Sequence, residues 1–437
     1  MKKNLNKREI NIPILTRVEG EGALNLQIEA GKITRLELAI YEPPRLFEKI
    51  LEGREPNEVV DAVARICGIC PVAYQMSAVH AIESCFDMAP GEWVRNMRRL
   101  FYCGEWIESH SIHVYMLAAP DFLGYSSMTD MARDYPDIVR DGMKIHSLGT
   151  RLMALLGKRA VHPVGACVGG FYHAPSLEEV HNLLVQFETC LPLAEALIPF
   201  TAKLNFPKAE HEFTAVSLHQ PSEYPINEGR IQSSSGLDID ISEYMDFFQQ
   251  HQVAYSTAQH STLSGKTYLT GPLARINLNY KHIPKNIQRL LKKNQIHFPS
   301  TNMFHSIVAR AVEIYYAMIE SIRLMRLYVT PPESRIKLTA KAGNGYGCTE
   351  APRGILWHYF EFAETGLVKR ARIIAPTSQN LSRIEEDLRH SLEEYGLDRS
   401  DDDLRYYSEK IIRNYDPCIS CATHFLRLKI ERVDSQL

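Results

Sequence analysis

The sequence predicts a mainly α fold of the α+β class, in which a large helical-bundle body carries a small N-terminal antiparallel β element. Two observations support this prediction. Between residues 9 and 42, apolar and polar residues alternate in two runs, 23–28 and 33–38, and Glu29-Ala30-Gly31-Lys32 between them is typical of a hairpin turn. From Glu58 onward apolar residues recur with the helical period, over the ranges 57–87, 91–118, 128–156, 176–204, 303–329, 383–395 and 401–414.

Prolines separate these helical ranges, for example at Pro43-Pro44 and Pro331-Pro332. The stretch 207–302 mixes Ser, Gly, Asn and Pro with short apolar runs and predicts no definite element. There is no internal repeat and no linker-like segment. We therefore expect one large domain, 1–437.

Composition excludes several classes of protein. The chain has 437 residues, 45% of them hydrophobic, and a net charge of −3, without a dense basic run. A large core is thus possible, and a nucleic-acid partner is not expected. Apolar stretches such as 191–200 are shorter than the roughly 20 residues that span a bilayer. The charged N-terminus precedes no apolar signal core, so we expect no membrane span and a cytoplasmic location.

Nine cysteines are too few for a disulfide scaffold in a chain of this length. Four of them form two C-x-x-C pairs, Cys67/Cys70 and Cys418/Cys421, and this spacing indicates metal or redox chemistry. Gly68 permits unusual backbone angles between the first two thiols. Pro417 ends the preceding helix and is expected to hold Asp416 extended. The other five cysteines are expected to be mostly small buried residues.

Either pair alone is more typical of a zinc knuckle or a redox disulfide. Zinc pairs, however, usually lie close together in sequence, whereas these pairs stand near opposite ends of the chain. A thioredoxin-like motif needs a strand-to-helix junction, which the N-terminal region does not resemble. Four soft thiolates from distant segments suit a buried catalytic metal. From spacing alone we expect a four-thiolate transition-metal site.

The residues around the thiols resemble the signature motifs of nickel–iron hydrogenase large subunits. The first pair lies in Arg65-Ile66-Cys67-Gly68-Ile69-Cys70, and the second in Asp416-Pro417-Cys418-Ile419-Ser420-Cys421-Ala422-Thr423-His424. Four further motifs occur in family order: Arg17-Val18-Glu19-Gly20-Glu21-Gly22; the central Gly157-Lys158-Arg159, His162-Pro163 and Gly169-Gly170; Glu350-Ala351-Pro352-Arg353-Gly354; and Ala375-Pro376-Thr377-Ser378-Gln379-Asn380. The resemblance covers residues 17–424 and implies the fold of that family.

The resemblance implies a nickel ion held by all four cysteines. Cys67 and Cys418 would be terminal ligands, and Cys70 and Cys421 would bridge to an iron that carries CO and cyanide. The expected activity is the reversible heterolytic oxidation of H2 to protons and electrons. In a plain structural reading the same cysteines would be zinc ligands.

Further roles are implied at the matching positions. Arg353 would place a permanent positive charge beside the metals. Pro376 and Thr377 would bind a cyanide, and Glu19 would accept the proton that leaves Cys418. Read without the family, these side chains would be a surface arginine, an ordinary turn and a solvated acid.

A magnesium-type ion is also implied, bound by Glu48, the carbonyl of Ile373 and His424, with a structural role. Residues 425–437 then correspond to the removable C-terminal extension of family precursors. We expect a maturation protease to cut after His424, with nickel-insertion chaperones acting earlier. The alternative is a permanent helix or strand.

No further cysteine cluster with iron–sulfur spacing remains in the sequence, so we expect an iron–sulfur small subunit to carry the electrons. Two departures are notable: Tyr74 replaces a family histidine that hydrogen-bonds a bridging sulfur, and Ser109 replaces an acid that pairs with the arginine. With the two cysteine motifs, they resemble the soluble cytoplasmic branch coupled to NAD(P) through diaphorase-type flavin subunits. The alternatives are a hydrogen-sensing relative and a metal-free quinone-oxidoreductase relative, which generally lacks the cysteines.

Overall fold

The computed structural model describes residues 7–424, so the predicted extension, 425–437, lies outside the described residues. The longer helices are α2 (Pro56–Val63), α3 (Pro71–Cys85), α4 (Glu92–Ser111), α6 (Met128–Asp134), α7 (Pro136–Gly157), α8 (Leu177–Ala202), α10 (Pro272–Asn279), α11 (Lys285–Lys293), α12 (His305–Arg326), α13 (Pro376–Tyr395) and α14 (Asp401–Tyr415). The short ones are α1 (Phe47–Ile50), α5 (Ala119–Leu123), α9 (Tyr244–Phe247), α15 (Ile419–Ala422), the π-helical η1 (Ile112–Ala118), and the 3-10 turns η2 (Ile241–Glu243) and η3 (Tyr280–His282).

The predicted N-terminal β element is present. Strands β1 (Lys7–Ile12), β2 (Gly22–Glu29) and β3 (Lys32–Ile40) form an antiparallel sheet. Its hairpin turn is the predicted one, because Ala30 and Gly31 both have positive φ, 49° and 75°. Alternate residues, such as Leu24 and Leu38, face the core. The sheet therefore has one buried face, as its alternating sequence indicates.

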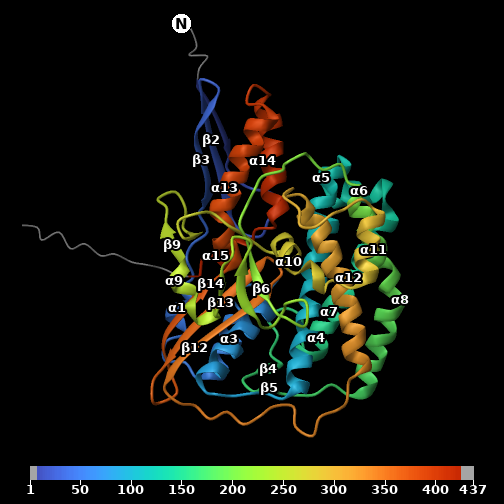
Figure 1. The fold of residues 1–437 in the computed structure, drawn as a ribbon, viewed down its shortest axis with the longest axis vertical. Helices are drawn as coiled ribbons and strands as arrows, with labels where there is room; N and C mark the ends of the chain where they lie inside the picture. Colours follow the sequence, from blue (N-terminus) through green and yellow to red (C-terminus); the bar gives the residue numbers. More distant parts are fainter. Residues whose placement is uncertain (1–6, 425–437) are drawn as a thin grey trace, which may run out of the picture.

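Helices α4, α7, α8 and α12 lie side by side and form the body of the molecule (Figure 1). Glycines let α4 and α7 approach closely: a Cβ on Gly149 would lie 2.6 Å from the backbone nitrogen of Glu108. Two predicted helices are each divided in the structure. The range 57–87 splits into α2 and α3 around the first cysteine pair, and 128–156 splits into α6 and α7 at Pro136, which cannot continue a helix.

Four β units were not predicted. Strands β12 (Gly343–Ala351), β13 (Gly354–Phe362) and β14 (Val368–Ile374) form an antiparallel sheet. The stretch 207–302 contributes β6 (Ala215–His219), β7 (Arg230–Ser233), β8 (Asp238–Ile239) and β11 (Leu269–Thr270), in the order β11-β6-β7-β8, and the hairpin of β9 (Phe248–Gln252) and β10 (Gln259–Leu263). A two-residue pair, β4 (Ala166–Cys167) and β5 (Gly170–Phe171), completes the described strands.

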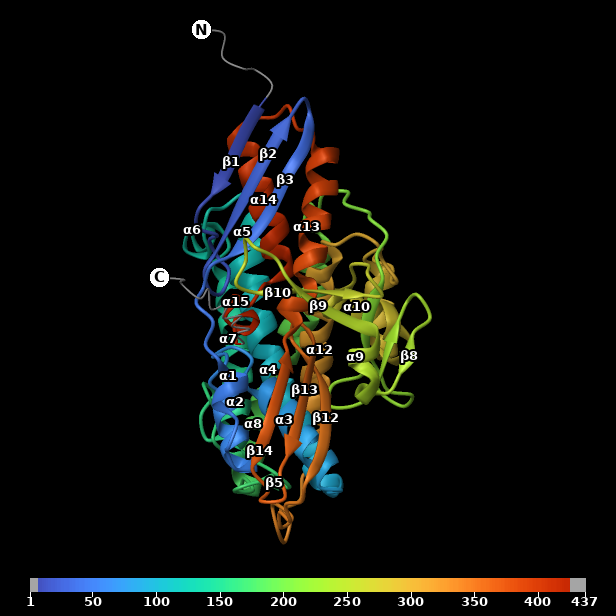
Figure 2. The same ribbon diagram turned by 90° about the vertical axis from the view of Figure 1, so that its left-hand side faces the viewer.

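The last helix of the described chain, α15, lies in the middle of the molecule. In Figure 2 the N-terminal sheet lies at the top and the β12–β14 sheet at the bottom, with α15 between them. The β12–β14 sheet packs on α3, whose first residues follow the first cysteine pair. One hydrophobic core runs from Ile10 to Ala422 and includes all four paired cysteines. This arrangement brings both pairs to one buried place.

Among the described residues, one helix is long and apolar enough to cross a membrane by length and composition. It is α8, with mean hydropathy 1.4 over the most apolar window, of which 28% is buried. A single helix of this kind is weak evidence for a span, since α8 also packs against α7 and α12. The absence of a span therefore stays a prediction.

Candidate metal centre

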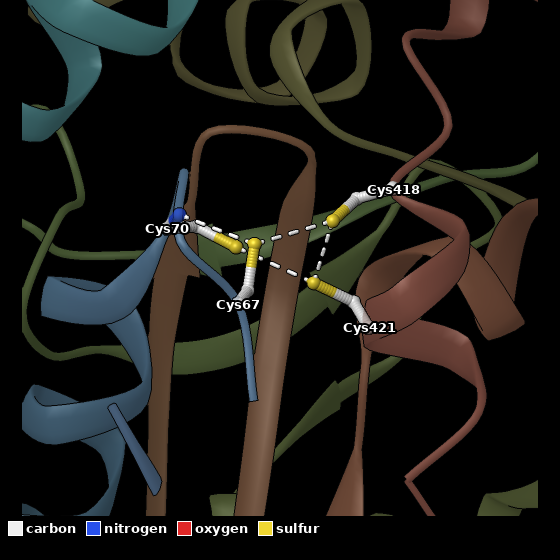
Figure 3. A group of neighbouring side chains, drawn as sticks. All are labelled: Cys67, Cys70, Cys418 and Cys421. Atoms are coloured by element: carbon white, nitrogen blue, oxygen red, sulfur yellow. Dashed lines mark hydrogen bonds between the residues drawn. The ribbon is translucent and has the colours of Figure 1, made fainter. Parts of the chain in front are cut away.

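The two cysteine pairs converge on one point (Figure 3). The Sγ atoms of Cys67 and Cys418 are 3.3 Å apart, those of Cys70 and Cys421 are 3.4 Å apart, and those of Cys418 and Cys421 are 2.8 Å apart. All four sulfurs lie within 4.8 Å of one another, and at most 3% of each residue is exposed. All four are free thiols. Sulfurs so arranged can all bind one metal ion.

Local structure positions the first pair. Cys67 lies in the turn between α2 and α3, and Cys70 is the N-cap of α3, with Pro71 at the first helical position. The buried carboxylate of Glu105 on α4 accepts the backbone N–H groups of Val72, at 2.6 Å, and Ala73, at 3.1 Å. It thus supplies acceptors that the start of a helix otherwise lacks. Sequence reasoning missed Glu105, because nothing links it to α3 along the chain.

The second pair is held by the N-terminal segment. Cys418 forms a parallel bridge with Glu19, and the N–H of Ile419 donates to the carbonyl of Glu19 at 3.0 Å. Gly20 makes this approach possible, since a Cβ there would lie 2.6 Å from the Cβ of Ile419. In the motif Arg17-Val18-Glu19-Gly20, glycine is therefore required at the last position because a larger residue would collide with Ile419.

The electrostatics of the thiols favour one negative charge at Cys67. Its pKa lies well below its ordinary value, because the other three cysteines hydrogen-bond its thiolate and Arg353 is near. Burial raises the pKa of Cys418 and of Cys421. The cage therefore holds protons that a bound cation would displace.

Arg353 lies beside the cysteines and pairs with Asp416. Its Nε donates to the carbonyl of Asp416 at 2.7 Å, and its Nη2 is 3.0 Å from the Asp416 carboxylate. The pKa of Arg353 is raised: burial opposes the charge, but Asp416 and the thiols of Cys418, Cys70 and Cys67 outweigh it. Nη1 is buried and makes no hydrogen bond within residues 7–424. The arginine thus keeps a free donor.

The prediction that Asp416 is extended is wrong. Asp416 has φ 55° and ψ 52°, in the left-handed region, and caps the C-terminus of α14. Aspartate tolerates this conformation better than most residues, and its ion pair with Arg353 holds it there. Pro417 ends the helix as predicted. The acid that pairs with Arg353 is therefore Asp416, which the sequence already shows in the Asp416-Pro417-Cys418 motif.

Glu19 meets the second cysteine pair with its side chain as well. Its carboxylate accepts the N–H of Ser420 at 3.1 Å. Burial raises its pKa, and the negative charge of Cys67 adds to the effect. A partly buried carboxyl with a raised pKa holds a proton more readily than an exposed glutamate and can still release it.

Pro376 and Thr377 open α13, next to the second pair. The Thr377 hydroxyl accepts the N–H of Cys418 at 3.1 Å, so its own O–H remains available to donate. The adjacent Ser378 hydroxyl is buried and makes no hydrogen bond with a described residue. Two hydroxyl donors thus lie at the start of this helix.

Glu48, Ile373 and His424, the residues of the predicted magnesium-type site, lie next to one another on α1, on β14 and at the end of the described chain. The N–H of Ile373 donates to Glu48 at 2.8 Å, and Nε2 of His424 donates to the carbonyl of Ile373 at 2.6 Å. At that separation no ion fits between His424 and Ile373. A cation would have to replace this hydrogen bond.

The two departures from the family also lie at the site. Tyr74 is buried, its pKa is raised by burial and by Cys421 and Cys70, and its hydroxyl makes no hydrogen bond with a described residue. Ser109 is buried and likewise makes none through its hydroxyl. Beside it, burial raises the pKa of Glu108 to about 8, although Arg353 opposes the shift. Sequence reasoning missed Glu108.

These residues fit a nickel–iron group. Four thiolates form a soft, anionic donor set for nickel. Nη1 of Arg353 and the hydroxyls of Tyr74 and Ser378 are buried donors without an acceptor in the described chain, as a group with hydrogen-bond-accepting ligands would require.

The comparisons with known proteins agree with this geometry. The family model described as nickel-dependent hydrogenase matches residues 45–136 and 219–424. The chain belongs to the nickel-dependent hydrogenase family. It is 33% identical to sulfhydrogenase 1 subunit alpha of Pyrococcus furiosus over 423 residues, which cover 96% of this chain and 98% of that protein. It is 30% identical to sulfhydrogenase 2 subunit alpha of the same organism, over 96% and 100%.

The hydrogenase fold is also evident in solved structures. An NAD+-reducing [NiFe]-hydrogenase in the H2-reduced state matches with a TM-score of 0.87 and 23% identity, covering 96% of this chain and 100% of that one. The predicted family and fold class are thereby confirmed. The chain is the catalytic large subunit of a nickel–iron hydrogenase.

Proposed function

We propose that this hydrogenase subunit oxidises H2 reversibly and heterolytically at a nickel–iron centre, and that its electrons pass through a partner iron–sulfur subunit to NAD(P). The observation that supports the proposal best is the convergence of four buried sulfurs within 4.8 Å of one another, beside the charged side chain of Arg353.

In this proposal Cys67 and Cys418 are terminal nickel ligands, and Cys70 and Cys421 also bind an iron with CO and cyanide ligands. When bound, the group supplies the redox chemistry that splits H2. Arg353 stabilises its negative charge, and Pro376 and Thr377 hold a cyanide.

Glu19 carries the proton away. Its position supports this role, since its carboxylate lies against Ser420, between the two ligands of the second pair, and has a raised pKa. The backbone bridge between Glu19 and Cys418 keeps the two residues next to each other. A fixed geometry of this kind favours proton transfer.

We also propose a magnesium-type ion at Glu48, the carbonyl of Ile373 and His424, and proteolytic removal of residues 425–437. The carbonyl of His424 already accepts the N–H of Phe47 at 2.8 Å, so a new carboxylate at His424 would arise beside Glu48. Mass spectrometry of the purified subunit tests the cut directly.

The same proposal includes the partners, the domain and the location. The partners are an iron–sulfur small subunit, which lies near Cys67 and Cys70, and diaphorase-type flavin subunits. The chain forms a single domain, 1–437, and is located in the cytoplasm. Ser109 and Tyr74 support the NAD(P)-linked branch. The names of the two sulfhydrogenase relatives make sulfur the main competing acceptor.

Infrared spectroscopy of the matured complex tests the centre, because metal-bound CO and cyanide absorb where protein does not. We expect CO and cyanide bands that change under H2, together with H2-dependent reduction of NAD or NADP. Bands without appreciable turnover would indicate a hydrogen sensor. Absence of the bands from a nickel-loaded, processed sample would overturn the proposal. Reduction of sulfur without reduction of NAD or NADP would show that NAD(P) is not the electron acceptor.

A further inference from the structure

Arg353 stands in a tight turn whose direction other residues must determine. The turn Pro352-Arg353 joins β12 to β13, where Ala351 pairs with Gly354. A two-residue loop leaves its own carbonyls outside the strand ladder. What binds those carbonyls therefore sets where the guanidinium of Arg353 points.

Arg275, on α10, binds one carbonyl of this loop, that of Pro352, and the carbonyl just before it, that of Ala351. Its Nη1 donates to the carbonyl of Ala351 at 2.7 Å, and its Nη2 donates to the carbonyl of Pro352 at 3.1 Å. The other N–H groups donate to carboxylates: Nη1 to Glu350 at 2.7 Å, and Nε and Nη2 to the two oxygens of Glu313, both at 2.8 Å. A guanidinium has five N–H groups, and here all five are used.

The surroundings hold Arg275 rigidly. Its side chain and those of Glu313 and Glu350 are completely buried, and its guanidinium lies 4.5 Å from the ring centre of Trp106. Burial would raise the pKa of Glu313, but Arg275 and His110 lower it to about 2, so it stays charged. Burial raises the pKa of Glu350 to about 7, although Arg275 opposes this. The arginine thus has one permanent counter-ion and one that titrates.

The segment before α10 contacts the same turn from the other side. Gly271 has φ 117°, and a Cβ there would lie 2.9 Å from the carbonyl oxygen of Arg353. The hydroxyl of Thr270 accepts the N–H of Ile355 at 3.0 Å. Residues 270–275 therefore enclose the turn that carries Arg353.

We propose that Arg275 is a positioning residue for Arg353, which it aims at the metal centre by binding the carbonyls of Ala351 and Pro352. The inference rests on the role proposed for Arg353 itself. Lysine cannot replace Arg275, because an ammonium has three donors at one point and cannot reach two carboxylates and two carbonyls at once.

The experiment compares Arg275→Lys with Arg353→Lys and with a control, Arg98→Lys, in the purified matured complex. Arg98 is also a buried arginine, paired with both oxygens of Glu83 at 2.7 and 2.6 Å, but it does not contact the turn. Nickel and iron content, the infrared cyanide bands, and kcat and KM for H2 are measured for each variant.

We expect Arg275→Lys to bind both metals, to shift the cyanide bands in the same direction as Arg353→Lys, and to lower kcat about tenfold or more with little change in KM. Arg98→Lys should keep wild-type bands and kcat. If Arg275→Lys does not accumulate, Glu313→Gln replaces it in the test. Glutamine has the shape of glutamate but lacks the charge that anchors Arg275. This variant should show a smaller shift of the cyanide bands and a smaller loss of kcat.

Wild-type bands and kcat in a metal-loaded Arg275→Lys variant would overturn the inference. If Arg275→Lys does not accumulate, the same result in Glu313→Gln would overturn it. An impaired Arg353→Lys variant would still uphold the proposed function. A normal Arg353→Lys variant would overturn both.

Discussion

The carboxylate of Glu19 accepts the backbone N–H of Ser420 at 3.1 Å, across 401 positions of the chain. The first motif and the last thus share one hydrogen bond and one backbone bridge. This contact closes the metal cage and places a titratable group beside it. In the proposed function, proton transfer and the integrity of the cage therefore depend on the same residue.

Glu19→Gln should separate these two contributions. Glutamine keeps an oxygen that can accept the Ser420 N–H, so metal content should stay normal, but it cannot carry a proton. We expect H2 oxidation and the exchange of D2 with solvent protons to fall by about 10²–10⁴-fold. Glu21→Gln, at an exposed neighbouring acid, serves as the control. A Glu19→Gln variant with half of the wild-type exchange rate would contradict the assignment.

The pH dependence of the wild-type enzyme follows from the same group. Glu19 must be deprotonated to accept a proton, and its pKa is raised above the usual value of 4.5. The rate should therefore decline as the pH falls through this raised pKa, earlier than for an ordinary glutamate. A pH profile of D2 exchange should show this acidic limb in the wild type and in Glu21→Gln.

Cys421→Ser should abolish binding of both metals, because a hydroxyl is a poor ligand for nickel and this thiol is one of the two proposed bridges to iron. Cys190→Ser is the matched control, since Cys190 is half-buried and lies outside the cluster. Elemental analysis after purification measures the outcome. Normal nickel and iron in Cys421→Ser would show that the metals are bound elsewhere.

Tyr74→Phe tests whether the buried phenol tunes the centre. Its hydroxyl has no acceptor among the described residues and lies near Cys70 and Cys421, so a bound cluster would give it a sulfur to donate to. We expect the variant to retain both metals and to change kcat less than about tenfold, with a small shift of the CO band, since one hydrogen bond is lost. An unchanged CO band would mean that Tyr74 only fills space.

Glu108→Gln should change how stability depends on pH. Burial raises the folded pKa of Glu108 to about 8 from 4.5, although Arg353 opposes the shift. The folded state then binds more protons than the unfolded state between these values, so the contribution of Glu108 to stability is lost as the pH rises from about 4.5 to 8. Glutamine resembles the protonated form.

The melting temperature of Glu108→Gln, relative to wild type, should therefore be higher at pH 9 than at pH 6. Glu178→Gln, at an exposed acid on α8, should show no such trend. A Glu108→Gln difference that is the same at both pH values would mean that Glu108 is already charged at pH 6.

How far the sequence predicts this molecule can be judged from particular residues. The hairpin at Ala30 and Gly31 was predicted because its alternating runs and turn residues are local signals. Strand β12 was missed because its glycines resemble a loop: a Cβ on Gly345 would lie 1.9 Å from the carbonyl oxygen of Ala81, and one on Gly347 would lie 2.1 Å from that of Ser77. The reason for these glycines is the close packing of β12 on α3, which only the folded chain shows.

The site shows the same contrast. The four cysteines, Arg353 and Glu19 stand in recognisable motifs, and the structure brings them together. Asp416 was assigned the wrong conformation, since the restriction that a proline places on the preceding residue was weaker than helix capping and the ion pair with Arg353. Glu105, Glu108 and Arg275 have no motif at all. Their importance arises from contacts between distant segments.

X-ray absorption at the nickel edge of the purified, processed subunit tests the central claim most directly. The account predicts nickel surrounded by sulfur at a metal–thiolate distance of about 2.3 Å, with an iron neighbour, and the loss of both in Cys421→Ser. A nickel ion bound mainly by nitrogen and oxygen, or zinc in its place, would contradict it.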